Sequence, residues 1–426
     1  MDYGILLFLL FFFLLFLGIP IAVAIGTAAI AVIYGAQLGT PIISSNFYAG
    51  IAKFPLLAIP LFILAGFLLE RCGISSRIIR LANRVIGHRT GALAIVALST
   101  CVFFGGISGS GPADAAAIGA ILIPAMAREG YDRSFSAALI AAGGSTAIIV
   151  PPSIALILYG AITNTSIGAL FAGGVFPGIL AGAALVVPAL IISRRRGYGS
   201  VATPSEPLLV VFKEAIWGLL APIVILGGLY GGIFTPTESA VVAVVYSLFV
   251  SLVVYRSLTL RDLFRIFADA SESSAVVMII VAFATLFAWA GSTVGVLDRA
   301  ASAMIGFSEN RYVLLLLINV LLLVAGMLMD PVTIYYIFLP VLIPIIAHLR
   351  WDPVWFGVMM TFNLAVGQFT PPVAVNLYVT TNIGKIPLED TFWEVIPFIF
   401  AMVAALVVVA LIPSLSTFLP SLFGLN

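Results

Sequence analysis

The sequence predicts an all-α polytopic membrane protein built from two inverted copies of one unit. Hydrophobic residues make up 62% of the 426-residue chain and charged residues only 9%, a composition that excludes an ordinary soluble domain. Apolar segments of about 20 residues, the length that crosses a bilayer, recur from end to end. Two stretches of the chain also match each other at a fixed offset.

The repeat is clearest where two apolar segments end in a proline pair. Tyr131–Pro152 and Trp351–Pro372 both begin with an aromatic residue followed by Asp, both end in Pro-Pro, and 351 − 131 = 220. Pro124 and Pro344 are related by the same offset. A duplicated membrane half with a Gly/Pro-interrupted helix in each copy is typical of secondary transporters, whose substrate and ion sites lie where the broken helices meet.

Clusters of arginine set the predicted orientation. They lie at Arg71–Arg89, Arg194–Arg196 and Arg256–Arg265, and an excess of basic residues marks the cytoplasmic side. With Ile5–Tyr34 as a single outward span, the N-terminus is predicted in the cytoplasm and the C-terminus outside. Each unit then contributes three full crossings, an odd number, so the two units must be inverted.

Two segments are predicted to be re-entrant hairpins. Ala92–Ala127 has a polar, glycine-rich middle, and its apolar flanks are too short to be separate spans joined by a loop in water. Leu314–Ala347 is its counterpart, with a tip at Gly326–Pro331. Irregular backbone is tolerated at membrane depth only where it is buried in protein or lines a cavity, so we expect each tip to face a site. A broken helix follows each hairpin, at Ser134–Ile162 and Val354–Thr381.

These elements divide the chain into four predicted segments. Residues 1–53 form an N-terminal scaffold helix and loop, and residues 201–270 form linking scaffold helices. The two inverted repeats are residues 54–200 and 271–426. Each repeat is predicted to contain a scaffold helix, an interfacial arm, a hairpin, a broken helix and a last helix.

Polar residues within the apolar segments concentrate at four places. These are Ser108–Asp114, Gly143–Thr146, Asp330–Thr333 and Asn363–Thr370. Hydroxyl, amide and free carbonyl oxygens are hard ligands that suit Na⁺, and helix N-termini at the same breaks offer partial positive charge to an anion. We expect each tip to pair with its own broken helix, which would give two symmetric cation sites.

The same residues also have purely structural interpretations. Asp330 precedes a proline and suits the N-cap of a helix, and Asp114 could be a first-turn partner of the helix dipole. Glycines such as Gly143 and Gly144 could simply permit close helix packing. Asp114 fits a structural role less well than Asp330, because an ionisable residue at membrane depth is functional by default.

Several other functions find no support in the sequence. A membrane-embedded enzyme would need a nucleophile with a base, yet no histidine lies near a buried serine and no HExxH motif occurs. ATP-driven transport would need a GxxxxGK[ST] loop, which is missing, and a net charge of +1 gives no footprint for nucleic acid. A channel is disfavoured by the broken inverted repeats. Coupling to protons, with Asp114 as the carrier, remains the closest rival to coupling to Na⁺.

Several motifs resemble a known family, the large membrane (M) subunit of TRAP (tripartite ATP-independent periplasmic) transporters. They are FPLLAIPLFILAG (54–66), FFGGISGSGPADAAAIG (103–119), GSTAIIVPPS (144–153), GGIFTPTES (231–239) and NLAVGQFTPPVAVNL (363–377). The resemblance covers essentially the full length. It implies a fold like that of the Na⁺/divalent-anion symporters, with an elevator mechanism in the bacterial inner membrane.

The resemblance also implies the substrate and the partners. We expect Na⁺-coupled uptake, without ATP, of an organic acid anion such as a sialic acid-like sugar acid or a C4-dicarboxylate. A periplasmic substrate-binding protein would deliver it, and a small membrane (Q) subunit would complete the transporter in the lipid bilayer. The alternative is a stand-alone organic anion symporter coupled to Na⁺ or H⁺.

Candidate site residues follow from the polar breaks and the matching motifs. For the first Na⁺ site they are Ser108, Ser110, Asp114, Gly143, Ser145 and Thr146. For the second they are Gly326, Asp330, Thr333, Gly367 and Thr370, so at least two Na⁺ ions are expected. Candidate substrate-binding residues are Gly109, Gly144, Pro151, Asn363, Gln368, Pro371 and Asn376.

Overall fold

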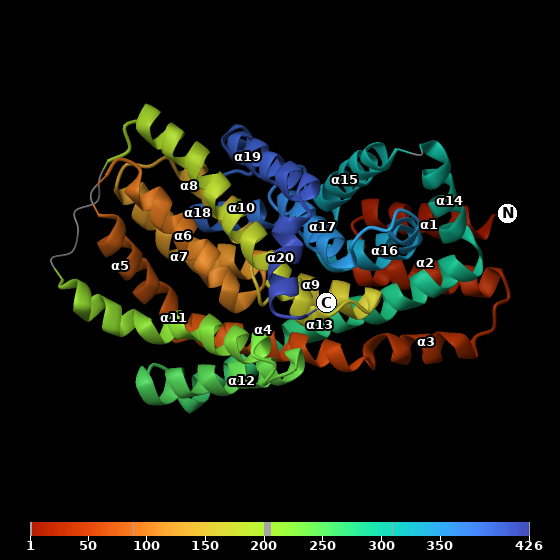
Figure 1. Cartoon of the computed structure of the whole chain (residues 1–426), viewed down its shortest axis with the longest axis horizontal. Coiled ribbons are helices and arrows are strands. Elements are labelled where there is room, and N and C mark those ends of the chain that lie inside the picture. Colours follow the sequence, from red (N-terminus) through yellow and green to blue (C-terminus); the bar gives the residue numbers. More distant parts are fainter. Residues whose placement is uncertain (1, 88, 200–205, 309, 426) are drawn as a thin grey trace.

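A computed structural model describes residues 2–87, 89–199, 206–308 and 310–425 and shows an all-helical chain (Figure 1). Within these ranges there are twenty α-helices and no β-strand. Eight helical segments of 18 residues or more are apolar enough to cross a membrane, counted over the same ranges. The all-α polytopic membrane fold is therefore confirmed. The predicted boundary between residues 200 and 201 lies outside the described residues.

The first half of the chain contains ten helices. They are α1 (Tyr3–Phe16), α2 (Ile21–Gly35), α3 (Pro41–Ile51), α4 (Ala58–Arg71), α5 (Ile74–Ile86), α6 (Ala92–Ser108), α7 (Gly111–Arg128), α8 (Arg133–Ser145), α9 (Ile154–Thr163) and α10 (Ile167–Arg195). A short 3-10 turn at Phe54–Leu57 leads into α4, and another at Thr146–Ile148 follows α8.

The second half repeats this order. Its helices are α11 (Leu208–Tyr230), α12 (Pro236–Phe249), α13 (Leu260–Thr293), α14 (Val296–Phe307), α15 (Arg311–Leu328), α16 (Pro331–His348), α17 (Pro353–Gly367), α18 (Val375–Gly384), α19 (Phe392–Leu411) and α20 (Ser414–Leu422). A π-helical turn at Val250–Val254 extends α12, and a 3-10 turn at Glu389–Thr391 precedes α19.

Both predicted hairpins and both predicted helix breaks are present. The pairs α6–α7 and α15–α16 are the hairpins, which Figure 1 places on opposite sides of the molecule. The first broken helix is α8 followed by α9, and the second is α17 followed by α18. Proline lacks the N–H that a helix needs, and each break contains a cis peptide bond, at Pro151-Pro152 and at Pro371-Pro372.

The expectation of a single first span at Ile5–Tyr34 is wrong. The helix ends at Phe16, Gly18 adopts a left-handed backbone with φ of 79°, and a new helix starts after Pro20. The Tyr3 hydroxyl donates a hydrogen bond to the Gly35 carbonyl at 2.5 Å, so α1 and α2 form an antiparallel pair. A glycine that accepts positive φ and a proline without a donor explain the turn inside an apolar run.

The two halves exchange the second parts of their broken helices. Helix α9 leaves α8 and packs against α16 and α17, which belong to the second half. Helix α18 leaves α17 and packs against α7 and α8, which belong to the first. Both hairpin tips and both breaks are thereby brought together between the two halves.

Helices outside this central group form a frame around it. Helix α12 packs on α4, the pair α1–α2 packs with α13 through α2, and α3–α4 runs beside α13. Helix α5 carries the arginines of the predicted interfacial arm and packs on α11. The frame of each half is therefore completed by a helix pair from the other half.

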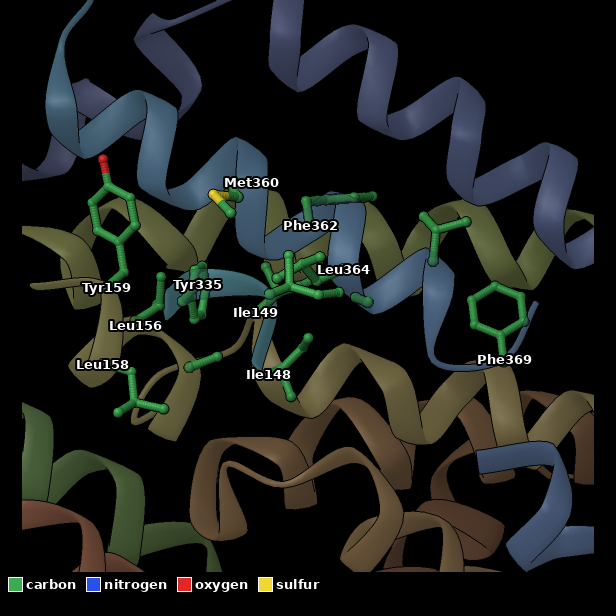
Figure 2. Packing of buried hydrophobic residues seen from close by; sticks show 14 of the residues in the cluster. Ile148, Ile149, Leu156, Leu158, Tyr159, Tyr335, Met360, Phe362, Leu364 and Phe369 are labelled. Carbon is green, nitrogen blue, oxygen red and sulfur yellow. The ribbon is translucent and has the colours of Figure 1, made fainter. Parts of the chain in front are cut away.

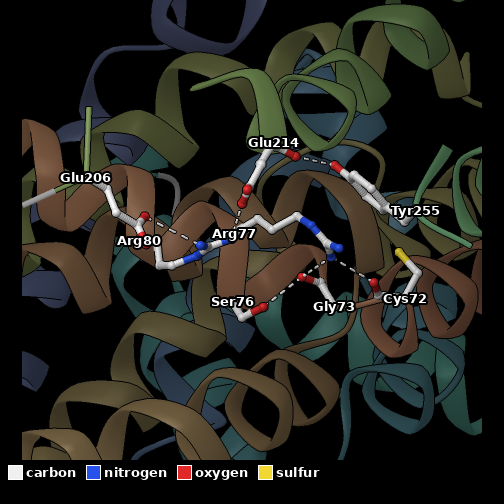
Figure 3. A network of polar contacts seen from close by, with 8 residues as sticks. All are labelled: Cys72, Gly73, Ser76, Arg77, Arg80, Glu206, Glu214 and Tyr255. Atoms are coloured by element: carbon white, nitrogen blue, oxygen red, sulfur yellow. Dashed lines mark hydrogen bonds and ion pairs between the residues drawn. The ribbon is translucent and has the colours of Figure 1, made fainter. Parts of the chain in front are cut away.

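Ion pairs fix both short helices that precede the hairpins. In Figure 3 the Arg80 guanidinium of α5 reaches Glu214 of α11 and, at 3.6 Å, Glu206. The Arg77 guanidinium lies 3.8 Å from the centre of the Tyr255 ring. These contacts attach α5 to the frame.

The equivalent helix of the second half, α14, is attached in the same way. The Arg299 guanidinium binds both carboxylate oxygens of Asp2, at 2.6 and 3.0 Å. Through these hydrogen bonds Arg299 lowers the pKa of the Asp2 carboxyl to about 2. Each arm is thus joined to the first helix region of the opposite half.

Candidate functional site

The centre of the molecule contains a cavity of about 170 Å³ that both hairpin tips line. Its walls come from the two tips, the two breaks and one frame helix. The lining residues are Gly109, Ser110, Gly111, Pro112, Ile148, Ile154, Ala155, Leu158, Val277, Gly326, Met329, Asp330, Pro331, Val332, Gln368 and Val375. We call this space the central cavity. Its lining contains no Lys, Arg or His.

Four helices begin at the wall of the central cavity. They are α7 at Gly111, α9 at Ile154, α16 at Pro331 and α18 at Val375, and each of these first residues is a lining residue. The first turn of a helix has N–H groups without intrahelical partners and carries partial positive charge. These four N-termini offer an anion partial positive charge without a basic side chain, while Asp330 places one carboxylate in the same wall.

The first tip packs on the first break, as predicted. A Cβ on Gly105 would lie 2.7 Å from the Cα of Ala147. A Cβ on Gly109 would lie 2.6 Å from the carbonyl oxygen of Pro152, and Gly109 itself has a φ of 63°. Only glycine permits both this backbone angle and this approach, which explains the glycine-rich tip.

The second tip packs on the second break in the same manner. A Cβ on Gly367 would lie 2.6 Å from the backbone of Gly326. The Val373 N–H donates a hydrogen bond to the Met327 carbonyl at 3.2 Å. The two close contacts lie at corresponding places in the repeat to within one residue, since 367 − 147 = 220 and 326 − 105 = 221. The predicted pairing of each tip with its own broken helix is confirmed.

Asp114 lies close to the first tip and is completely buried. The Ser108 hydroxyl donates a hydrogen bond to one of its carboxylate oxygens. The other oxygen has no hydrogen-bond partner among the described residues. The Ser110 N–H donates to the Ser108 hydroxyl oxygen at 3.2 Å, so Ser108 joins the tip backbone to Asp114. Asp114 lies in the first turn of α7, as expected for a partner of the helix dipole, although it caps no backbone N–H there, and its second oxygen is available to a cation.

The predicted residues of the first break do not all face the first tip. Gly144 faces the first tip, since a Cβ there would lie 3.1 Å from the Gly111 carbonyl oxygen. Gly143 instead packs against Cys101 of α6. The hydroxyls of Ser145 and Thr146 donate to carbonyls of their own helix, both at 2.7 Å, which leaves their oxygen lone pairs available.

Asp330 at the second tip takes the structural role that was considered for it. One carboxylate oxygen accepts a hydrogen bond from the Thr333 N–H at 3.1 Å, and the other accepts from the Thr333 hydroxyl at 2.6 Å. This is an N-cap of α16. The Thr370 hydroxyl donates to the Val366 carbonyl at 2.6 Å. The second tip has no pair of serines, so a cation there would rely on backbone carbonyls such as that of Gly367, which accepts a hydrogen bond from the Thr370 N–H at 3.1 Å and keeps a second lone pair.

Gln368 and Asn376 connect the second break to the first tip. The Gln368 amide oxygen lies beside Gly111, and the Asn376 side-chain N–H donates to the Ala141 carbonyl at 3.1 Å. Both amide oxygens are buried without a partner in the described part of the chain. Gln368 also lines the central cavity. The two repeats therefore build this site jointly.

Five of the seven predicted substrate-binding residues lie outside the cavity lining: Gly144, Pro151, Asn363, Pro371 and Asn376. The Asn363 amide donates to the Asn319 backbone and side-chain carbonyls, both at 2.9 Å, inside the contact of α15 with α17. Pro151 is buried behind Gly106, and Pro371 is half-buried at the outer side of its break. Sequence reasoning missed Asn319, although a lone asparagine within an apolar helix was a signal for a buried polar partner.

Apolar side chains pack together around the two breaks. Figure 2 shows side chains from the first break, from α9, from α16 and from α17 gathered in one cluster. The Tyr335 hydroxyl shares a 2.6 Å hydrogen bond with the Thr361 hydroxyl, and its ring meets the edge of Tyr159. One close-packed cluster therefore joins the first break to helices α9, α16 and α17.

Comparison with known proteins relates the chain to transporters. Residues 8–415 match the family described as tripartite ATP-independent periplasmic transporter, DctM component. The chain is 39% identical to the isethionate TRAP transporter permease protein DctMQ of Oleidesulfovibrio alaskensis, over 96% of this chain and 65% of that protein. It therefore spans just under two thirds of that relative.

Other relatives match along their whole length. The C4-dicarboxylate TRAP transporter large permease protein DctM of Rhodobacter capsulatus is 35% identical over 99% of this chain and 100% of its own. The sialic acid TRAP transporter large permease protein SiaM of Vibrio cholerae is 37% identical over 96% of each chain.

A solved structure shows the same fold. The Alcanivorax borkumensis YdaH transporter, described as having an unusual topology, superimposes with a TM-score of 0.65 over 87% of each chain, at 15% sequence identity. The family match over nearly the whole chain, the identity to full-length relatives and this fold agree. The chain belongs to the DctM family of TRAP transporter large permease proteins.

Proposed function

We propose that the protein drives Na⁺-coupled uptake of a small organic acid anion across the bacterial inner membrane. The observation that carries this proposal is the convergence of four helix N-termini on one cavity that has no basic side chain. Such a cavity can hold an anion but leaves part of its charge uncompensated. Cations bound at the two tips would supply the remainder.

The relatives narrow the substrate to organic anions. Those quoted above are named for isethionate, C4-dicarboxylates and sialic acid. The central cavity, at about 170 Å³, is close to the ~150 Å³ of a cavity that holds benzene. A C4-dicarboxylate or a similarly small acid fits this volume better than a sugar acid does.

Two groups of oxygens support the proposed Na⁺ sites. At the first tip they are the free carboxylate oxygen of Asp114 and the hydroxyls of Ser108 and Ser110. At the second tip they are the carbonyls near Gly326 and Gly367. An anion entering a poorly solvated pocket needs opposite charge nearby, so Na⁺ should raise the affinity for the substrate, and by linkage the substrate should raise the affinity for Na⁺.

The proposed mechanism is an elevator in which the hairpins and broken helices move as one unit. Side chains of the first break, α9, α16 and α17 pack together (Figure 2), and ion pairs join α5 to α11 (Figure 3) and α14 to Asp2. The arms would then stay with the frame, and the hairpin that follows each arm would slide past it. Gly66 of α4, which meets Ser108 without a side chain between them, would allow this sliding.

The orientation also follows from the ion pairs. Arg71 binds Asp269 in α13, and Arg299 binds Asp2 beyond the end of α13 at Thr293. The 24 residues between Asp269 and Thr293 (293 − 269) rise about 36 Å, more than the ~30 Å hydrocarbon core. With the Arg71 end in the cytoplasm, Asp2 lies on the periplasmic side. We therefore propose a periplasmic N-terminus in place of the cytoplasmic one that a single first span implied.

The C-terminus is proposed on the same side. The Phe423 ring stacks on Tyr230 at the end of α11, with ring centres 5.1 Å apart. The start of α11 lies beside Arg80 at the arginine-rich end. The opposite end of this 23-residue helix then faces the periplasm.

The proposed partners are a periplasmic substrate-binding protein and a small membrane subunit. The DctMQ relative is longer than this chain, which spans 65% of it, and its name combines an M and a Q component. We therefore propose that this chain acts together with a Q component.

Uptake into proteoliposomes tests the proposal. The vesicles would contain this chain with its small subunit, the cognate binding protein outside, and radiolabelled organic acids in turn. We expect uptake only with an inward Na⁺ gradient and only with the binding protein. Uptake without the binding protein would indicate a stand-alone symporter, and uptake on a proton gradient alone would overturn the Na⁺ coupling.

A further inference from the structure

A second cavity, of about 180 Å³, lies between the first tip and the frame. Ser108, Ser110 and Ala113 form its side toward the tip, while Glu70 of α4 and Ser273 of α13 form its frame side. Ser110 also lines the central cavity, as do Ile154 and Val277, so the two spaces adjoin. We call the second space the frame cavity.

Helix α4 comes into direct contact with the first tip at this cavity. A Cβ on Gly66 would lie 3.3 Å from the Cα of Ser108. Glu70 follows Gly66 by four residues, about 6 Å along the same face of the helix, and both residues line the cavity. The Glu70 carboxylate therefore lies about one helical turn from the Ser108–Asp114 pair, toward the arginine-rich end of α4.

Glu70 makes no ion pair with any basic residue in the part of the chain that the structure describes. Its neighbour Arg71 is engaged by Asp269. Among the described residues no hydrogen bond and no ion pair reaches the Glu70 carboxylate, and it is the one charged group that lines the frame cavity. A half-buried, unpaired carboxylate is costly unless a cation visits it.

We propose that Glu70, with the hydroxyls of Ser108 and Ser273, forms a transient binding station for a monovalent cation between the first tip and the cytoplasm. This inference rests on the proposed function. It gives the frame, and not only the hairpins and broken helices, a role in the passage of the ion. Asp114, buried beside Ser108 with one free carboxylate oxygen, is the neighbouring station on the tip.

The chemistry of the cavity selects a monovalent cation. One carboxylate and two or three hydroxyl oxygens are hard ligands carrying a single negative charge. Ca²⁺ takes six to eight oxygens, usually with several carboxylates, which the frame cavity does not provide. Na⁺ leaving the first tip can exchange its ligands there for Glu70 and water.

A cation station at Glu70 predicts that Na⁺ affects uptake differently from the two sides of the membrane. Glu70 would concentrate Na⁺ in the frame cavity, and it lies next to Arg71 at the arginine-rich end of α4, which we assign to the cytoplasm. Internal Na⁺ should therefore rebind readily and inhibit uptake. Removing the charge should weaken that inhibition while leaving the affinity for external Na⁺ unchanged.

The test measures uptake by Glu70→Gln in proteoliposomes at varied internal Na⁺. We expect the internal Na⁺ concentration for half-inhibition to rise about fivefold, in line with the loss of one partly screened charge contact. Glu70→Asp should restore part of the wild-type value. Glu272→Gln is the matched control, because Glu272 is exposed on α13 next to Ser273 and should leave both Na⁺ dependences unchanged.

Each outcome separates this inference from the proposed function. A wild-type protein without any Na⁺ dependence would overturn the proposed function itself. If the wild type depends on Na⁺ but Glu70→Gln has the same internal Na⁺ concentration for half-inhibition, the cation station alone is overturned. The same holds if Glu70→Gln shifts the internal and the external Na⁺ dependence equally. If Glu70→Gln fails to fold, Ser273→Ala gives the decision, because it should shift the internal Na⁺ dependence in the same direction by a smaller factor.

Discussion

Replacing Gly367 by alanine should separate the second tip from its break. The new Cβ would lie 2.6 Å from the backbone of Gly326, whereas carbon atoms in contact prefer about 3.5–4.0 Å. No flexible side chain can move away, so the tip must shift by about 1 Å. Such overpacking costs about 1–3 kcal/mol.

The shift should appear in transport as well as in stability. It displaces the carbonyls of Gly326 and Gly367, which we propose as Na⁺ ligands, and it moves the start of α16 at the central cavity. A loss of about 1–3 kcal/mol in cation or substrate binding corresponds to about a 5- to 150-fold rise in the half-saturating concentration. Proteoliposome uptake at varied Na⁺ and thermal unfolding in detergent measure the two effects.

A matched control is available in the same membrane environment. Gly227 lies in α11, and a Cβ there would meet no heavy atom within 4 Å. Gly227→Ala should leave uptake unchanged. If Gly367→Ala transports with the same Na⁺ dependence as Gly227→Ala, the close contact of tip and break does not position the second cation site, and the reasoning fails.

Three further predictions concern other parts of the structure. Asn376→Ala removes the hydrogen bond from the Asn376 amide to the Ala141 carbonyl and should lower the free energy of unfolding by about 0.5–1.5 kcal/mol in thermal or denaturant unfolding; an unchanged stability would show that this bond does not join the two repeats. Asp114→Asn should raise the Na⁺ concentration for half-maximal uptake at least about tenfold, and normal Na⁺-driven uptake by this variant would remove Asp114 from the first cation site. Cysteines at Arg80 and Glu214 that are joined by a flexible bifunctional thiol reagent should leave the uptake rate unchanged, because both residues belong to the frame; blocked transport would show that the arm moves with the hairpin.

Much of the fold could be predicted because both halves of the sequence carry the same signals for helix breaks and hairpins. A helix at membrane depth that contains Gly and then Pro-Pro cannot stay continuous, and the same pattern occurs 220 residues later. The hairpins followed from two apolar flanks too short to be separate spans around a polar tip. These arguments need only local composition, and the structure confirms both elements.

The first span shows where local composition was insufficient. Phe16 to Ile21 is apolar apart from Gly18 and Pro20, and a hydrophobic run of that length looks like one crossing. Residues that face lipid and residues that face protein differ little in polarity. The sequence therefore contains no polar residue that would mark the turn between the antiparallel helices α1 and α2. The exchange of α9 and α18 between halves was likewise hidden, since it depends on long-range packing.

The sequence predicted where the candidate site lies better than it predicted which side chains contact one another there. Gln368 and Ser110 line the central cavity, whereas Asn363 pairs with Asn319 and Gly143 packs against α6. Sequence position identifies which polar residues lie near a break. The rotation of each side chain about its helix is set by tertiary packing, which a single sequence does not reveal.

Substrate binding to the purified protein at varied Na⁺ tests the central claim most directly. The claim is that one cavity, built by both tips and both breaks, binds an organic anion with help from cations rather than from basic side chains. Titrating a C4-dicarboxylate by calorimetry should give an affinity that rises with Na⁺ and is insensitive to K⁺. Equal affinity in Na⁺ and K⁺ would contradict the account, because the anion would then be held without the cations on which the proposed coupling depends.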